Sequence, residues 1–367
     1  MLYYIKFKNS FSPICTAVYN GVEACRIMRG SLIALAVVIV CIVFAAYLYL
    51  SPSSQPAGEL KIFCAGSLAL PLNATAHEFE AAYPKVKVII EPSGSVMAVR
   101  KVTDLGREVD ILALADYRLI PKFLMPNYTS FCICFATNEL ALAYTPSSKY
   151  AGEINEDNWY QILSKEDVRF GFSSPNDDPC GYRALMSIAL AELYYNTSLL
   201  DQLVVNNSNI WVEKASEKFH IYVPPDLAPT SDKLVIRHKS VDLIALLEAG
   251  TLDYAFEYKS VAVQHGLNFI SFPKEINLAS PDLADLYGKV HVYIFAGSEK
   301  ESVLSGAPIV YGVTILDAAP NREAAISFTK FLLSSAGKNI FEQHGQDFLE
   351  PYILIGEAPE ELNQLLK

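Results

Sequence analysis

Residues 86–116, VKVIIEPSGSVMAVRKVTDLGREVDILALAD, decide the fold that this chain is expected to adopt. Apolar runs at the two ends of this stretch are short and rich in β-branched residues, as buried strands are. Between them lies the apolar spacing of a helix, which Ser95 begins and Gly106 ends. A strand, a helix and a further strand in this order predict a parallel βαβ unit. The unit extends backwards, because another strand and helix pattern precedes it from residue 60.

The same alternation returns in the second half of the chain, around the helical run GYRALMSIALAELYYN at 181–196. The chain has 367 residues, which is too long for one ordinary core. We therefore predict an α/β protein with two lobes, mostly parallel sheets and a ligand cleft between the lobes. One lobe is expected to comprise residues 60–143 plus 260–367 and the other residues 144–259. The chain would then pass between the two lobes twice.

An apolar run at residues 32–50, LIALAVVIVCIVFAAYLYL, is uncharged and long enough to span a bilayer as a helix. Arg26 and Arg29 precede it, and the first acidic residue after it is Glu59. Because positive charges favour the cytoplasmic side, this arrangement predicts that the bulk of the chain lies outside the cell.

The start of this leader suggests how the N-terminal part is divided. Met28 opens a short basic and then apolar segment of the kind that begins an export signal. We expect residues 28–50 to be an uncleaved membrane anchor, with a cleaved signal as the alternative. Residues 51–59 are expected to form a Ser/Pro linker, and residues 1–27 an extension that is not native to the protein.

Composition and charge exclude several classes of protein. The net charge is −11 and no basic run is interleaved with aromatic residues, which argues against nucleic-acid binding. The six histidines have no HxH or HExxH spacing, so no zinc site is expected. No GxSxG, P-loop or GxGxxG sequence stands in its motif context. We therefore expect a binding protein without a cofactor, and we keep a membrane-tethered α/β enzyme as a remote alternative.

Cysteines are too few after the linker to form a disulfide scaffold in an exported chain of this length. One bridge remains possible, and the sequence does not say which pair would form it. The four residues concerned are Cys64, Cys132, Cys134 and Cys180.

Three loops combine glycine with serine or aspartate where a predicted strand gives way to a predicted helix. They are Gly66–Ser67, Gly94–Ser95 and the stretch DDPCG at 177–181. Free backbone N–H groups and the helix dipole favour an anion at such a helix start. A single loop of this kind is explained by helix capping, but three in one two-lobed chain predict an oxyanion cleft.

Asp178 conflicts with a simple anion site. At about 4 Å, a carboxylate repels a dianion by about 8 kcal/mol at an effective dielectric of 20. Each charge-assisted hydrogen bond returns only about 1.5–3 kcal/mol. Asp178 must therefore cap a helix away from the anion, be protonated, or bind the central metal of the anion. We interpret Asp177 as an ordinary solvent-side acid.

The motifs PNDDPCGYR (175–183) and YKSVAVQHG (258–266) resemble those of the archaeal molybdate/tungstate-binding proteins, the solute receptors of an ABC transporter. The resemblance extends over residues 59–350. It implies a type II periplasmic-binding fold, capture of molybdate or tungstate, and delivery to a membrane permease driven by a cytoplasmic ATPase. The protein is then expected to be a monomer at the outer face of the cell membrane. A receptor for sulfate, phosphate or a small acid on the same fold is the alternative.

The resemblance also implies a metal with four oxo groups and two protein carboxylates, of which Asp178 is the first. The second carboxylate falls at Ser240, where this chain has none. Either Ser240 donates its hydroxyl to an anion of lower coordination, or Asp242 reaches in from a shifted helix start. Glu257 ends a predicted strand at the cleft and could contribute a carboxylate there, but we interpret it as an outward surface acid. The other residues that the resemblance assigns to the oxyanion are Gly66, Ser67, Ser95, Pro179, Cys180 through its N–H, and Tyr258.

Overall fold

The computed structural model describes residues 38–42 and 55–363. The chain separates into two units, residues 1–55 and 56–367. In the first unit the described residues, 38–42, form a short helical stretch. Within the described part of the chain, no helix is both long enough and apolar enough to cross a membrane. The predictions for residues 1–27, for most of the anchor and for the linker before residue 55 lie outside the described residues.

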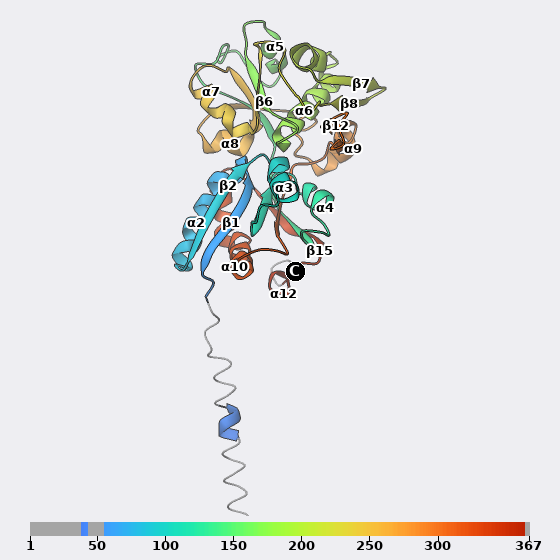
Figure 1. The fold of residues 1–367 in the computed structure, drawn as a ribbon. Helices are drawn as coiled ribbons and strands as arrows, with labels where there is room; N and C mark the ends of the chain where they lie inside the picture. Colours follow the sequence, from blue (N-terminus) through green and yellow to red (C-terminus); the bar gives the residue numbers. More distant parts are fainter. Residues whose placement is uncertain (1–37, 43–54, 364–367) are drawn as a thin grey trace, which may run out of the picture. The chain divides into compact units, whose positions relative to one another are not determined.

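A six-stranded sheet with the order β15-β4-β14-β3-β1-β2 occupies the lower half of the second unit in Figure 1. β1 pairs in parallel with β2 and β3, whereas β14 runs antiparallel to β3 and β4. The predicted strand, helix and strand within 86–116 are confirmed as β2, α3 and β3. The strands are β1 (Gly58–Ala65), β2 (Val86–Ser93), β3 (Ile111–Leu114), β4 (Phe131–Thr137), β14 (Val310–Ile315) and β15 (Phe348–Gly356).

Two groups of helices accompany this sheet. α2, α10 and α11 pack together, and α3 packs with α4. The bounds are η1 (Gly66–Leu68), α2 (Ala69–Ala82), α3 (Ser95–Thr103), α4 (Leu119–Phe123), α10 (Arg322–Leu332), α11 (Ser335–Gln343) and, near the C-terminus, α12 (Glu360–Asn363).

A five-stranded sheet with the order β11-β5-β10-β6-β9 lies in the upper half of Figure 1. β6 pairs in parallel with β9 and β10, and β5 runs antiparallel to β10 and β11. Its strands are β5 (Leu140–Tyr144), β6 (Phe170–Ser173), β9 (Leu234–Arg237), β10 (Tyr254–Tyr258) and β11 (Asn268–Ser271). Its helical elements are α5 (Trp159–Ser164), α6 (Pro179–Tyr195), η2 (Leu200–Val204), η3 (Val205–Asn207), η4 (Ser240–Leu243), α7 (Ile244–Glu248) and α8 (Lys259–Gln264).

A third, four-stranded sheet has the order β13-β12-β8-β7 and stands beside α6. Two of its strands, β7 and β8, come from residues 200–232. The edge strand β7 is mostly exposed, so it lacks the apolar alternation that would have revealed it. The elements are β7 (Trp211–Ala215), β8 (Lys218–Tyr222), η5 (Pro281–Leu283), α9 (Ala284–Tyr287), β12 (Val290–Ile294) and β13 (Ser302–Ser305).

The strand pairings correct the predicted boundary between the lobes. The chain leaves the six-stranded sheet between β4 and β5, close to the first predicted crossing. It returns between β13 and β14, at 305–310, and not near residue 260. Alternating strand and helix patterns do not say which sheet a strand joins, and β11 joins β5 by antiparallel pairing. Below, lobe 1 denotes residues 58–137 with 310–356, and lobe 2 denotes residues 140–305.

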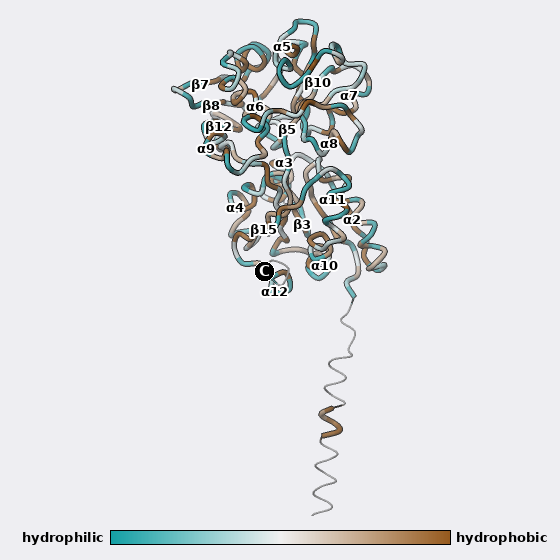
Figure 2. Tube along the Cα trace, turned by 180° about the vertical axis from the view of Figure 1, so that it is seen from behind, coloured by the Kyte–Doolittle hydropathy of each residue, from teal (hydrophilic) through white to brown (hydrophobic). Residues whose placement is uncertain are grey.

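Helix α6 forms much of the apolar interior of lobe 2. Every residue from Pro179 to Ala191 is buried, which explains why the run ALMSIALA is apolar on all sides. In Figure 2 the hydrophobic colour gathers on the inner strands of each lobe, with hydrophilic segments towards the outside. Packing inside lobe 2 fixes the N-terminus of α6, where Asp178 lies close to Gly94 of lobe 1.

Candidate functional site

The first loop, Gly66–Ser67, begins η1 directly after β1. A Cβ atom at Gly66 would lie 3.1 Å from Val241 Cγ2 on η4, so this loop of lobe 1 touches lobe 2 closely. The buried hydroxyl of Ser67 lies 3.0 Å from Tyr311 Oη. The loop is therefore held between β14 of its own lobe and η4 of the other.

The second loop, Gly94–Ser95, begins α3 and meets the third loop. Ser95 Oγ accepts a hydrogen bond from Ala115 N at 3.0 Å, and Met97 N donates to Asp177 O at 3.2 Å. A Cβ atom at Gly94 would lie 2.2 Å from Asp177 O, which no ordinary contact allows. Only glycine lets the two lobes come together at this point.

The third loop places Asp178 at the N-cap of α6. Its Oδ1 accepts from Cys180 N at 3.2 Å, and its Oδ2 accepts from Ser240 N at 2.8 Å. Pro179 has no N–H, so Cys180 is the donor of the pair, and the structure gives its N–H to Asp178. Burial raises the pKa of Asp178 to about 6, although the two N–H donors oppose this. The carboxylate is thus both a helix cap and a contact to η4.

Ser240 begins η4 and is buried. Besides its N–H bond to Asp178, its Oγ donates to Glu257 Oε1 at 2.9 Å. Asp242 is directed elsewhere: its carboxylate is partly exposed and lies 3.4 Å from Lys239 Nζ. Of the two expected substitutes for a second carboxylate, the structure therefore brings Ser240 into the cluster and leaves Asp242 at the surface.

The interpretation of Glu257 as an outward surface acid is wrong. Glu257 is 0% exposed, because β10 is an inner strand of its sheet and all five of its residues are buried. Oε1 accepts from Tyr258 N at 2.8 Å as well as from Ser240 Oγ. Burial raises the pKa of Glu257 to about 8, and the negative charge of Asp178 adds to this. Among the described residues, Oε2 has no hydrogen-bond partner.

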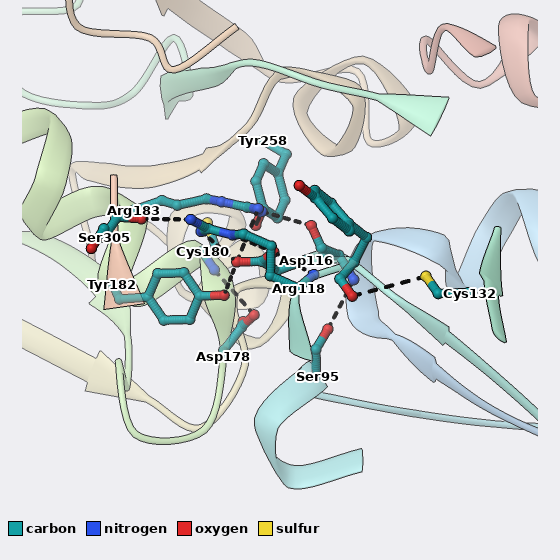
Figure 3. A network of polar contacts seen from close by, with 12 residues as sticks. Ser95, Asp116, Arg118, Cys132, Asp178, Cys180, Tyr182, Arg183, Tyr258 and Ser305 are labelled. Carbon is teal, nitrogen blue, oxygen red and sulfur yellow. Dashed lines mark hydrogen bonds and ion pairs between the residues drawn. The ribbon is translucent and has the colours of Figure 1, made fainter. Parts of the chain in front are cut away.

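A buried guanidinium, that of Arg183, was not expected from the sequence and belongs to the same polar network as Asp178 and Tyr258 (Figure 3). Arg183 is 1% exposed and donates through Nη1 to Tyr258 Oη at 2.6 Å and to Ala115 O of lobe 1 at 2.8 Å. A single Arg inside a mostly apolar helix was the available signal, since long cationic side chains are rarely buried without a partner.

Asp116 of lobe 1 completes this network. Its Oδ2 accepts from Tyr182 Oη at 2.8 Å and lies 3.6 Å from Arg183 Nη2. Although burial opposes ionisation, the guanidinium groups of Arg118 and Arg183 hold the pKa of Asp116 below its usual range. Helix α6 therefore carries Asp178 at its start and, one turn later, two side chains that contact lobe 1.

Asp177 also differs from the sequence interpretation as a solvent-side acid. Its side chain is 12% exposed, and Oδ2 lies 3.0 Å from Nδ1 of the exposed His238. The pair stands at the rim of a hollow of about 450 Å³, which Arg100 and Arg237 also line. Basic side chains therefore lie next to Asp177 at this hollow, even though the chain as a whole is acidic.

The described residues contain no group of three His, Cys, Asp or Glu side chains that could hold a metal ion. Cys64, Cys132, Cys134 and Cys180 are buried and free. The site offers a set of helix starts and hydroxyl groups, three buried carboxyl groups (Asp116, Asp178 and Glu257) and one buried guanidinium. Such an arrangement suits an anion whose centre can also accept a carboxylate oxygen.

Residues 60–346 match the family model described as bacterial extracellular solute-binding protein. The chain belongs to this family. Membership confirms the expectation of a binding protein rather than an enzyme, and it indicates an exported protein.

Several curated proteins are similar to this solute-binding protein over nearly their whole length. The molybdate/tungstate-binding protein WtpA of Thermococcus kodakarensis is 47% identical over 93% of this chain and 98% of its own. The protein of the same name from Pyrococcus abyssi is 48% identical over 86% and 92%. An uncharacterised solute-binding protein of Staphylothermus marinus is 52% identical over 90% and 94%. The resemblance drawn from the sequence motifs is thus confirmed.

Solved structures show the fold. The Azotobacter vinelandii periplasmic molybdate-binding protein has a TM-score of 0.52 and 15% identity, over 80% of this chain and 99% of its own. The sulfate-binding protein SubI from Mycobacterium tuberculosis has a TM-score of 0.53 and 12% identity, over 80% and 88%. The predicted two-lobed periplasmic-binding fold is confirmed by these likenesses.

Proposed function

We propose that this solute-binding protein captures molybdate or tungstate outside the cytoplasm and presents it to an ABC permease for import. The relatives named for these anions cover nearly the whole chain, which supports the proposal. The observation that carries it is the position of Asp178, a buried carboxylate where the loops of both lobes meet.

The argument concerns charge. A tetraoxo dianion is attracted by the N-termini of α3 and α6 and by nearby hydroxyl groups. A buried carboxyl group at the same place repels a dianion unless it is protonated or binds the central atom, and only the second case turns the repulsion into a bond. Molybdenum and tungsten can accept additional oxygen ligands, whereas sulfur and phosphorus in their tetraoxo anions cannot. Asp178 therefore favours the two metal oxyanions.

The remaining parts of the proposal concern delivery. Membership of an extracellular family supports export, and the apolar run at 32–50 supports retention at the membrane as an anchor. The lobes would close over the anion by bending at the two crossings, near 137–140 and 305–310. A monomeric receptor of this kind would dock its closed form on the permease, whose cytoplasmic ATPase drives import.

Calorimetry of the full-length protein in detergent tests the proposal with tungstate, molybdate, sulfate and phosphate. We expect tight binding of tungstate and molybdate and weak or no binding of sulfate and phosphate. Tight binding of sulfate with none of tungstate would overturn the proposal. That result would favour the alternative receptor, for which the missing carboxylate at position 240 is the specific observation.

A further inference from the structure

One carboxyl oxygen of Glu257, Oε2, is buried in the site without a hydrogen-bond partner among the described residues. The Glu257 side chain is completely buried, and Oε1 is used by Tyr258 N and Ser240 Oγ. Oε2 finds no hydrogen-bond donor anywhere in residues 55–363. Buried carboxyl oxygens are costly unless they are bonded, so an orphaned one points to a partner outside the protein chain.

Ser240 connects this atom to Asp178. The serine donates its N–H to Asp178 Oδ2 at 2.8 Å and its hydroxyl to Glu257 Oε1 at 2.9 Å. One residue thus orients both carboxyl groups, from α6 and from β10. The hydroxyl at position 240 is already committed to Glu257, which argues against a direct role for it on the anion.

Arg183 brings a positive charge into the same cluster, where it favours ionisation of Asp178. Its Nε and Nη2 make no hydrogen bond to any residue that the structure describes, although Nη2 lies 3.6 Å from Asp116 Oδ2. The same guanidinium holds Tyr258, the residue next to Glu257, through its hydroxyl. Glu257 thus holds an unused acceptor and Arg183 unused donors, and both residues contact Tyr258, as a ligand with both a cationic centre and anionic oxygens would require.

We propose that Glu257 supplies the second carboxylate of the site and binds the central metal of the oxyanion through Oε2, with Ser240 as its positioning residue. This inference rests on the proposed function. The carboxylate oxygen adds a lone pair to the metal, no group leaves, and a proton carried by the carboxyl group passes to water.

Specificity for metal oxyanions follows from this assignment. Asp178 repels every tetraoxo dianion, and Glu257 adds a second negative charge once it loses its proton, so sulfate and phosphate gain no bond from either carboxyl group. Molybdate and tungstate alone among these anions convert both repulsions into bonds. Glu257 is therefore a determinant of discrimination as well as of affinity.

Glu257→Gln is the central variant, because the amide keeps an oxygen for Ser240 Oγ and Tyr258 N while it removes the carboxylate. In calorimetry we expect its affinity for tungstate to fall by about a hundred-fold or more, as when one partner of a buried charged contact is lost. Its affinity for sulfate should stay the same or rise. Asp242→Asn, which neutralises the exposed acid of η4, is the matched control and should bind tungstate as the unchanged protein does.

X-ray absorption at the tungsten edge gives a readout that a structural role would not change. The wild-type protein should show six oxygen neighbours around tungsten, and Glu257→Gln should show five. The double variant Ser240→Glu/Glu257→Gln, which moves the carboxylate to position 240, should recover affinity and the sixth oxygen.

The possible failures are distinguishable. Unaltered tungstate affinity in Glu257→Gln, or four or five oxygens around tungsten in the unchanged protein, would overturn the assignment of Glu257 alone. Absence of tungstate binding by the unchanged protein would overturn the proposed function together with this inference. If Glu257→Gln does not fold, the oxygen count of the unchanged protein still decides.

Discussion

Gly94→Ala tests whether the two lobes must meet for the ligand to be held. A methyl group at this position would lie 2.2 Å from Asp177 O, about 1 Å closer than an ordinary contact permits. The loops would have to separate, which breaks the bond from Met97 N to Asp177 O. Overpacking costs about 1–3 kcal/mol and the lost hydrogen bond about 0.5–1.5 kcal/mol.

The sum is about 1.5–4.5 kcal/mol against closure, so tungstate affinity should fall by roughly 10- to 2,000-fold. Calorimetry measures the affinity, and thermal unfolding without ligand serves as the second assay. Because the methyl group obstructs only the approach of lobe 2, the melting temperature should change little. Gly152→Ala is the matched control, since a Cβ atom there meets nothing within 4 Å. Wild-type affinity in Gly94→Ala would refute the reasoning.

Three further predictions concern charges in the same site. Asp178→Ala should weaken tungstate binding far more than Ser67→Ala, and equal losses in calorimetry would count against metal binding by Asp178. Because burial raises the pKa of Glu257 from 4.5 to about 8, the folded protein holds that proton more tightly than the unfolded chain. The resulting stability is full below pH 4.5 and lost as the pH rises through 8, so urea unfolding should show a loss of about 4 kcal/mol between pH 5 and 9 that Glu257→Gln lacks. An equal loss in both proteins would contradict this. Asp116→Ala leaves Arg183 buried without its ion-pair partner and should lower the free energy of unfolding by about 3–5 kcal/mol, whereas Asp242→Ala at the surface should have little effect.

Local patterns predicted much of this fold because burial and capping act over a few residues. The strands around 86–116 and the helix from Pro179 onwards follow from apolar spacing and from turn residues. The second crossing could not be predicted in this way. It depends on antiparallel pairing of β11 with β5, a contact between segments more than a hundred residues apart.

The same limit explains which site residues were found. Gly94 and Ser95 stand out because a glycine before a helix has a local meaning, and Asp178 because it caps α6. Glu257 has no such local signature, and a cation within an apolar helix, the signal at Arg183, does not tell which residues it contacts. Their importance comes from burial, which an inner strand and a covered helix impose through the whole packing of lobe 2.

The orphaned polar atoms of Arg183 and Glu257 bear on how a receptor reports that it is loaded. Each buried atom without a bond, among the residues that the structure describes, costs about 1–3 kcal/mol when water is removed from it. If the lobes closed without a ligand, these atoms would lose water and gain no bond. A bound anion with a metal centre would give them bonding partners. The closed conformation would then be rare in the ligand-free receptor. A permease that recognises the closed conformation would therefore seldom bind a receptor that carries no anion.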